Sequence, residues 1–301
     1  MNKHSKGMIG WLGCGLMATP MISRQLAAGY TVHVWNRSPE KMLPLVDAGA
    51  IPAESPADIG GRAERVLMCL MDASAVEQTV FGEHGLISQS AKPEALKARI
   101  LVDHSSIRPD ATREFAARLK ASSGIRWLDA PVSGGVVGAS NGSLAIMVGG
   151  DAQALAQVEP LLRCYGTQVT HMGPVGAGQT TKLINQILVC SAMTTIAESV
   201  ALAQAAGIDA SKLPAALAGG WADSKPLQII GPRMINGYEG SIGALSTLLK
   251  DIDTALDLAR SVNCALPMAA SAQQLLRLMS ARGLGDADPA ELVSLYRQRQ
   301  A

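Results

Sequence analysis

The chain has very few aromatic residues. Phenylalanine, tryptophan and tyrosine make up 3% of its 301 residues. Its core must therefore consist mainly of alanine, leucine, isoleucine, valine and methionine, which suit helices packed closely on one another or on a parallel sheet. At this length the chain can form two domains of ordinary size, each with a core of its own.

An excess of charge of one sign is also absent. The net charge is +1 at pH 7, and no stripe of lysine or arginine stands out. Nucleic acids and anionic membrane surfaces attract clustered positive charge. The charge balance therefore argues against both as partners.

Paired cysteines and clustered histidines are missing as well. The five cysteines form no Cys-x-x-Cys pair, so we expect neither a disulfide framework nor a zinc site. The five histidines show no ligand spacing, so we expect no metal ion. The apolar segment Met8–Leu12 is too short for a signal peptide or a membrane span. These absences predict a cytoplasmic protein.

A glycine-rich turn follows the first predicted strand. The strand is Met8–Leu12, the next helix is expected at 19–28, and between them stand Gly13, Cys14, Gly15, Leu16, Met17 and Ala18. In a dinucleotide-binding unit the first glycine makes the tight turn, the second lets the backbone approach the pyrophosphate, and the third position must be small. Such a pattern alone is weak evidence, but a second strand, Thr31–Trp35, follows at the expected distance. We therefore predict a dinucleotide site at Gly13, Gly15, Leu16 and Met17.

The residues after the second strand bear on the choice of cofactor. Asn36, Arg37 and Ser38 stand where NAD-preferring sites usually carry an acidic residue. An arginine can pair with the 2'-phosphate of NADP through two hydrogen bonds, whereas an acidic side chain would repel it. The alternative is a solvated arginine at the end of a strand. The segment predicts a preference for NADP, with NAD left open.

Strands and helices then alternate as far as residue 171, which predicts a mostly parallel, doubly wound sheet. Strands are expected at 65–70, 100–103, 126–128, 144–148 and 168–171, and helices from about 74, at 110–121 and at 152–165. Ligands of such sheets bind beyond the carboxyl ends of the strands. The segments expected to face that crevice are Leu70-Met71-Asp72, His104-Ser105-Ser106 and Pro131-Val132-Ser133-Gly134-Gly135. The Ser-Gly-Gly turn could hold a carboxylate through backbone N–H groups, or could be only a glycine-rich loop.

After residue 174 the pattern changes to helices alone. They are expected at 178–206, 211–218, 226–236, 241–262, 267–282 and 289–298. We therefore predict an α/β cofactor domain over 1–174 and an all-helical domain over 175–301.

The first of these helices carries an unusual lysine. Lys182 and Glu198 are its only charged residues before Gly207, and apolar residues occur all around its circumference, which predicts burial on every side. Burying a lysine costs desolvation free energy, so a buried lysine is expected to have a charged or polar partner or a role in function. Asn185 and Gln186 share its face and could point with it into one cleft. The alternative is a lysine that extends from the first turn to solvent.

The same helix has more apolar surface than one small helical domain can cover. Part of that surface should therefore be buried against another subunit, which predicts a dimer or tetramer.

Four segments appear in the order in which they occur in the β-hydroxyacid dehydrogenase family, which the chain resembles. They are Gly10-Trp-Leu-Gly-Cys-Gly-Leu-Met-Ala-Thr-Pro-Met21, Asp129-Ala-Pro-Val-Ser-Gly-Gly135, Gly176-Ala-Gly-Gln-Thr-Thr-Lys-Leu-Ile-Asn-Gln186 and Lys250-Asp251. The family includes 3-hydroxyisobutyrate dehydrogenase and tartronate semialdehyde (2-hydroxy-3-oxopropionate) reductase. The resemblance implies a Rossmann domain joined by a long helix to an all-helical domain, with oligomers built through the helical part.

The resemblance also implies an activity and roles for single residues. It implies hydride transfer between nicotinamide C4 and a small β-hydroxy acid or aldehyde acid. Lys182 matches the catalytic lysine, and Ser133, Gly134 and Gly135 match the loop that holds the substrate carboxylate. Ser106 matches a hydroxyl residue beside the nicotinamide ribose, and Lys250 matches a lysine near cofactor and substrate. Members with Asn-Arg-Ser after the second strand tend to use NADPH.

The chain also departs from the family pattern. Ala18 replaces a more usual glycine, and Met71-Asp72 stands where a proline and a polar residue are common. Some members carry asparagine at the position of Gln186, which leaves open whether Asn185 or Gln186 contacts the substrate. Two alternatives to a dehydrogenase remain. One is an imine reductase, a group that lacks the lysine, and the other is a non-catalytic NADP-binding module.

Overall fold

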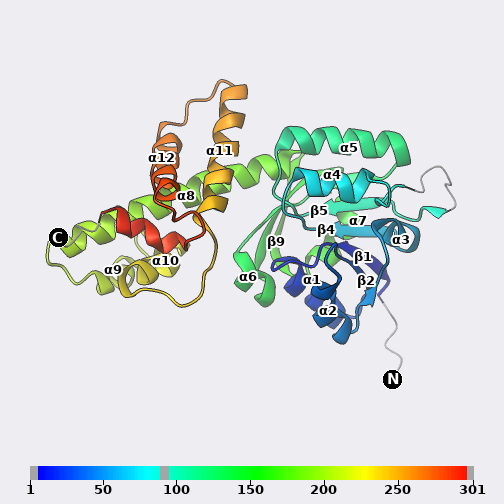
Figure 1. Cartoon of the computed structure of the whole chain (residues 1–301), viewed down its shortest axis with the longest axis horizontal. Helices are drawn as coiled ribbons and strands as arrows, with labels where there is room; N and C mark the ends of the chain where they lie inside the picture. The colour runs from blue at the N-terminus through cyan, green and yellow to red at the C-terminus, as the bar shows by residue number, and fades with distance from the viewer. Residues whose placement is uncertain (1–5, 89–94, 297–301) are drawn as a thin grey trace. The chain divides into compact units, whose positions relative to one another are not determined.

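A computed structural model describes residues 6–88 and 95–296 of the chain. It divides into two compact units, Met1–Lys182 and Leu183–Ala301. The first is an α/β unit, here called the Rossmann unit, and the second is the helical unit (Figure 1). The division falls inside helix α8 (Ala177–Ala205), after the boundary expected from sequence, because the first turns of α8 pack with the Rossmann unit.

Among the described residues of the Rossmann unit, nine strands form one sheet. Their order is β3-β2-β1-β4-β5-β6-β8-β7, with β9 paired to β8. The strands are β1 (Met8–Leu12), β2 (Thr31–Trp35), β3 (Ile51–Pro52), β4 (Arg65–Met68), β5 (Ile100–Asp103), β6 (Arg126–Asp129), β7 (Val132–Ser133), β8 (Leu144–Gly150) and β9 (Gly166–Gly173). Pairing is parallel from β3 to β6 and antiparallel where β8 meets β6 and β7. The carboxyl ends of β1, β2, β4, β5 and β6 therefore share one edge.

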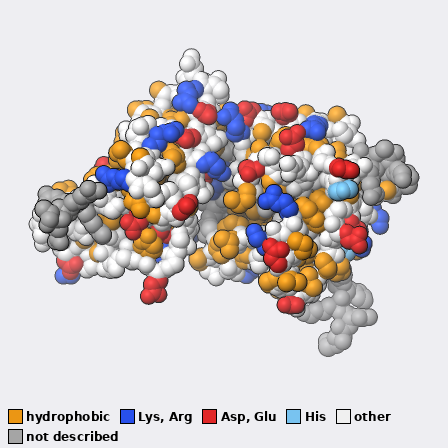
Figure 2. All heavy atoms as spheres, in the orientation of Figure 1, with side chains coloured by type: hydrophobic (Ala, Val, Ile, Leu, Met, Phe, Trp, Pro, Cys, Tyr) orange, Lys and Arg blue, Asp and Glu red, His pale blue; other side chains and the backbone are white. Residues whose placement is uncertain are grey.

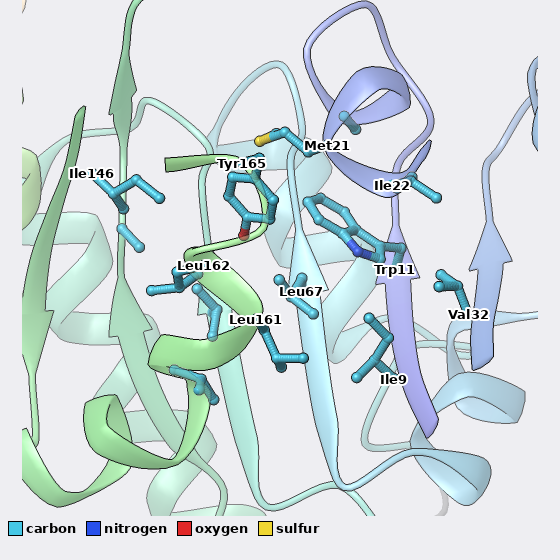
Figure 3. Close-up of a cluster of buried hydrophobic side chains, with 14 of the residues drawn as sticks. Ile9, Trp11, Met21, Ile22, Val32, Leu67, Ile146, Leu161, Leu162 and Tyr165 are labelled. Carbon is cyan, nitrogen blue, oxygen red and sulfur yellow. The ribbon is translucent and has the colours of Figure 1, made fainter. Parts of the chain in front are cut away.

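Helices cover both faces of this sheet. They are α1 (Ala18–Ala27), η1 (Pro39–Met42), α2 (Leu43–Asp47), α3 (Pro56–Arg62), α4 (Ala73–Phe81), α5 (Pro109–Ser123), α6 (Gly135–Asn141) and α7 (Ala152–Leu162). Side chains alternate between the faces of a strand, so Trp11 joins the core with α1 and α7, whereas Leu12 joins the core with α3, α4 and α5. Figure 3 shows the first core, where Trp11 lies near Tyr165 and Ile22.

The helical unit begins with the rest of α8 and has one core. Its other elements are η3 (Ala210–Lys212), α9 (Leu213–Leu217), α10 (Lys225–Asn236), α11 (Leu245–Ser261), α12 (Pro267–Ala281) and η4 (Pro289–Leu295). Val200, Ile230, Ile252 and Leu276 meet in the core. Three expectations are wrong in detail: the expected helix 211–218 divides into the 3₁₀ helix η3 and the short α9, α11 begins at Leu245 rather than at residue 241, and the described part of the last expected helix, 289–298, contains a 3₁₀ helix.

Helix α8 is not buried on every side. Ile184, Leu188 and Leu202 are 53%, 68% and 71% exposed, whereas Ala197 and Val200 lie in the core of the helical unit. The helix is also long and apolar enough to cross a membrane, with 39% of its most apolar window buried. Its buried face is that of a core helix, and its exposed face is an apolar surface that the described chain leaves uncovered. On the face of the molecule drawn in Figure 2, side chains of both charges are interspersed.

Candidate active site

The glycine turn between β1 and α1 has the shape that a dinucleotide site requires. Gly13 has φ +97°, and a Cβ there would lie 2.5 Å from the carbonyl oxygen of Cys69, so only glycine fits. At Gly15 an added Cβ would meet no atom within 4 Å. The backbone at Gly15 therefore faces open space into which a pyrophosphate can come close. Leu16 is exposed and Met17 half-buried beside this space.

A hollow of about 860 Å³ adjoins the turn. Its lining comprises Cys14, Gly15, Leu16, Thr19, Pro20, Ser23, Arg24, Ala27, Lys41, Val136 and Ser140. The Arg24 guanidinium donates hydrogen bonds to the carbonyl oxygens of Cys164 (2.6 Å) and Ser140 (3.0 Å), so it braces the scaffold. Lys41 is an exposed cation that follows the Arg37-Ser38 segment. The sequence analysis did not identify Lys41 as a candidate cofactor-binding residue, although its position four residues after Arg37 could have indicated one.

Asn36 connects the glycine turn to the segment that follows β2. Its Oδ1 accepts a hydrogen bond from the Cys14 N–H (2.9 Å), and its Nδ2 donates to the Ser38 carbonyl oxygen (2.9 Å). Both ends of the amide therefore hold the backbone of the predicted cofactor loops. Arg37 is exposed, and among the described residues it takes part in no ion pair, so its guanidinium is available to a phosphate.

The loops after β4 and β5 are tied together by Ser105. The Leu70 N–H donates to the Ser105 hydroxyl (2.9 Å), and the Ser105 N–H donates to Oδ1 of Asp103 (2.9 Å). Burial raises the pKa of Asp103 to about 7, against the hydrogen bonds from Ser105, and the neighbouring Asp129 raises it further. The half-buried Ser106 follows directly in this loop. Met71, predicted to bind cofactor, is 85% exposed in the loop between β4 and α4.

Lys182 lies beside the loop expected to hold the substrate. Its half-buried side chain donates a hydrogen bond from Nζ to the carbonyl oxygen of Val132 (2.9 Å). Val132 directly precedes Ser133, and Gly134 and Gly135 turn the chain from β7 into α6. The structure thus brings together two segments that the sequence could only name separately, since the hydrogen bond joins residues 50 positions apart.

The start of α8 is held by a carboxylate. Asp129, at the end of β6, accepts hydrogen bonds from the N–H groups of Gly176 and Gln179, both at 2.8 Å. Burial raises the pKa of Asp129, and the backbone hydrogen bonds oppose that rise. Sequence reasoning assigned no role to Asp129 or Gln179, although each stands within a segment that resembles the family.

In the helical unit, Gln186 and Asn185 differ in their surroundings. Gln186 is 8% exposed, and its Nε2 donates to Oδ2 of Asp251 (2.6 Å) while its Oε1 accepts from Nδ2 of Asn185 (2.9 Å). Lys250 pairs with the other oxygen of Asp251 at 3.3 Å. Both ends of the Gln186 amide are therefore occupied inside the helical unit, whereas Asn185 is half-buried.

Within residues 6–88 and 95–296, no three histidine, cysteine, aspartate or glutamate side chains are grouped so that they could hold a metal ion. The carboxylates of Asp103, Asp129 and Asp251 are engaged by hydrogen bonds or an ion pair within the protein, and the other polar groups described above are hydroxyls, amides, ammonium groups and backbone N–H groups. These suit an organic anion and its carbonyl group.

Comparison with known proteins extends over nearly the whole chain. The sequence profile of the NAD binding domain of 6-phosphogluconate dehydrogenase matches residues 8–173. The profile described as NAD-binding of NADP-dependent 3-hydroxyisobutyrate dehydrogenase matches residues 176–296.

Individual relatives align equally fully. The chain is 35% identical over 287 residues to 2-hydroxy-3-oxopropionate reductase of Escherichia coli (strain K12), with 95% of each chain covered. It is 30% identical over 304 residues to mitochondrial 3-hydroxyisobutyrate dehydrogenase of Bos taurus, with 98% of this chain and 88% of the bovine protein covered. A crystal structure of 3-hydroxyisobutyrate dehydrogenase from Salmonella typhimurium, 25% identical, has a TM-score of 0.84 and covers 96% of this chain and 100% of that chain.

Proposed function

Since the chain belongs to the β-hydroxyacid dehydrogenase family of NAD(P)-dependent oxidoreductases, we propose that it is an NADP-preferring enzyme acting on a small aldehyde acid or β-hydroxy acid. The observation that carries the proposal is the hydrogen bond from Lys182 to Val132, which holds an ammonium group beside the Ser133–Gly135 turn. An acid and an anion-binding turn are what the reduction of an aldehyde acid requires. The bovine and E. coli relatives are named for substrates of this class.

The cofactor would be held by the glycine turn and the segment after β2. The open space at Gly15 suits the pyrophosphate, and Leu16 and Met17 would border it. Arg37, assisted by Lys41, would bind the 2'-phosphate. Leu70, Met71 and Ser106 would line the nicotinamide end. A bound nicotinamide supplies the hydride, and the chain supplies orientation, charge and a proton.

Lys182 would be the general acid in reduction and the general base in oxidation. Negative charge grows on the carbonyl oxygen as the carbon is reduced, and an ammonium within hydrogen-bond reach both stabilises that charge and delivers the proton. The Val132 carbonyl oxygen keeps the ammonium near Ser133 until a substrate arrives. Backbone N–H groups around Gly134 and Gly135 would hold the substrate carboxylate.

Of the two amides, we assign the substrate contact to Asn185. Gln186 is buried and bonded at both ends of its amide, so its part is to hold Asn185 and Asp251. Lys250, 49% exposed on α11, would add positive charge for an anionic ligand.

A panel of C3 to C5 hydroxy acids and aldehyde acids, assayed with both NADP(H) and NAD(H), tests the proposal. We expect turnover of at least one member, with higher kcat/KM for the phosphorylated cofactor. Cyclic imines belong in the same panel, because turnover of imines alone would identify an imine reductase. Tight NADPH binding without turnover of any compound would identify a cofactor-binding module instead.

A further inference from the structure

Two buried polar side chains, Asp129 and Gln179, connect the start of α8 to three loops at the carboxyl edge of the sheet. They are 0% and 1% exposed. Asp129 accepts from the N–H groups of Gly176 and Gln179, both at 2.8 Å. The Gln179 side chain donates from Nε2 to the Ser105 carbonyl oxygen (2.6 Å), and the Ser105 hydroxyl accepts from the Leu70 N–H (2.9 Å). One network therefore joins α8 to the segments after β4, β5 and β6.

A helix start does not require this arrangement for stability alone. Five other helices of the described chain begin on an exposed or half-buried serine or aspartate that accepts one backbone N–H, as Ser55 does for α3 and Ser224 for α10. The exception is η4, which begins on the buried Asp288, whose two oxygens accept from the N–H groups of Ala290 and Ile242. At α8 the cap is a fully buried carboxylate that uses both oxygens, and burial without such partners would be costly. Two bonds from one rigid carboxylate fix the direction of the helix start as well as satisfying its N–H groups.

Close backbone packing leaves this turn no room to shift. A Cβ at Gly178 would lie 2.4 Å from the Met147 carbonyl oxygen and 2.5 Å from that of Asp129. A Cβ at Gly149 would lie 2.5 Å from Oδ1 of Asp129. The first turn of α8 therefore rests directly on the ends of β6 and β8, and the network sets its place there.

Lys182 follows Gln179 by one helical turn on the same side of α8. Its ammonium donates to Val132, in the segment that leaves Asp129. Gln179 also bonds Ser105, the neighbour of Ser106. Hydrogen bonds therefore connect this part of α8 both to the expected substrate loop, through Lys182, and to the expected cofactor loop, through Gln179.

We propose that Gln179 and Asp129 are positioning residues for hydride transfer. Gln179 fixes the spacing between Lys182 and the Ser105-Ser106 loop, and Asp129 fixes the direction of the turn that carries Lys182. Neither touches the reacting atoms. The inference rests on the proposed roles of Lys182 and Ser106, and it predicts a defect in the chemical step rather than in binding.

The experiment compares Gln179→Met with Gln25→Met. Gln25 is a matched control, because it is 0% exposed in the same unit and its Nε2 donates to a backbone carbonyl oxygen, that of Leu161. Gln179→Met should lower kcat roughly ten- to hundredfold, the scale of a small misplacement of a catalytic group. The KM of the acid and the Kd of NADPH should change less than about threefold, and the deuterium isotope effect on kcat with C4-deuterated NADPH should rise. Gln25→Met should lower Tm but leave kcat near that of the unmutated protein.

Two kinetic results would overturn the inference: a normal kcat in Gln179→Met, or an equal loss of kcat in Gln25→Met. If Gln179→Met does not fold, Gln179→Asn takes its place, because the shorter amide cannot reach Ser105 but remains polar. Crystal structures of the variants give a measure independent of turnover. Displacement of Lys182 Nζ from the Val132 oxygen in the Gln179 variant alone supports the inference, and an unmoved Lys182 overturns it. If the unmutated protein turns over no hydroxy acid, the proposed function fails, while this structural result still decides whether Gln179 positions Lys182.

Discussion

At the scale of single residues, Lys182 is the group on which turnover should depend most. Lys182→Ala should lower kcat roughly a hundredfold or more, the usual effect of losing a positioned acid or base. NADPH binding, measured by fluorescence titration, should be nearly unchanged, because the residues expected to hold the cofactor lie in other segments.

Lys182→Arg serves as the charge-preserving control. It should not restore turnover, because a guanidinium holds its proton too tightly to deliver it. Near-normal turnover in Lys182→Ala would contradict the assignment and return the lysine to a structural role.

Arg37 should determine the choice of cofactor. Charge-assisted hydrogen bonds are worth about 1.5–3 kcal/mol each, so Arg37→Asp should lower the ratio of kcat/KM for NADPH over NADH at least roughly tenfold. The measurement is kcat/KM with each cofactor at saturating substrate. Equal efficiency with both cofactors in the unmutated protein would contradict a role for Arg37 in specificity.

Asp103 should make stability depend on pH. Burial raises the pKa of its carboxyl from 3.8 to about 7, and Oδ2 has no hydrogen-bond partner among the described residues. The folded protein therefore holds a proton that the unfolded chain releases between these values, so stability should fall as pH rises from about 4 to 7. Asp103→Asn keeps an oxygen to accept from Ser105 and cannot ionise. Its Tm should exceed that of the unmutated protein at pH 8, and the difference should shrink towards pH 4.

The control for this prediction is Asp110→Asn. Its exposed carboxyl has a lowered pKa, mainly because Arg108 donates hydrogen bonds to it, so the substitution should not raise Tm at pH 8. A Tm difference for Asp103→Asn that stays constant from pH 4 to pH 8 would show that ionisation of Asp103 does not limit stability.

At the scale of elements, α8 leaves an apolar face uncovered by the described chain. Ile184, Leu188 and Leu202 lie on that face with exposures above one half. Apolar surface of this kind marks an interface, and a second copy of the chain would bury it in a symmetric pair. We expect a dimer or tetramer in solution.

Leu188→Asp should weaken this association by placing a charge in the interface. Sedimentation at micromolar concentration should show a shift towards the 31.3 kDa monomer. Leu43→Asp, on an exposed leucine of α2, is the matched control and should leave the assembly intact. An unmutated protein that sediments only as a monomer would contradict the prediction.

Short elements were the ones that sequence patterns did not find. Helix α3 contains two glycines in its C-terminal half, and α6 begins on a glycine and contains another, so neither shows a long apolar period. Gly60 in α3 is explained by packing, because a Cβ there would lie 2.6 Å from the Leu86 carbonyl oxygen. Such close approaches between distant segments leave no periodic signal in a single sequence.

At the scale of the whole molecule, the sequence was enough for the fold class and for the order of the longer elements. Regular alternation of apolar runs and amphipathic segments predicted the doubly wound sheet, which the structure and the family comparison confirm. The change to helices alone after residue 174 predicted the helical unit. These signals are local, because the turn, the strand and the helix are each determined by residues close together in the chain.

The contacts that make a site from these elements depended on the tertiary structure. The Lys182 and Gln179 bonds to Val132 and Asp129 each span 50 positions, and Gln186 reaches Asp251 across 65. The sequence determined that a lysine, two amides and a glycine turn were present. Only folding decided that Gln186 is buried in a hydrogen-bond chain, that Asn36 bridges two loops, and that one face of α8 stays exposed. The physical reason is that hydrogen-bond partners and burial depend on segments that are far apart in the chain and meet only in the folded structure. The local pattern around a residue therefore does not reveal them.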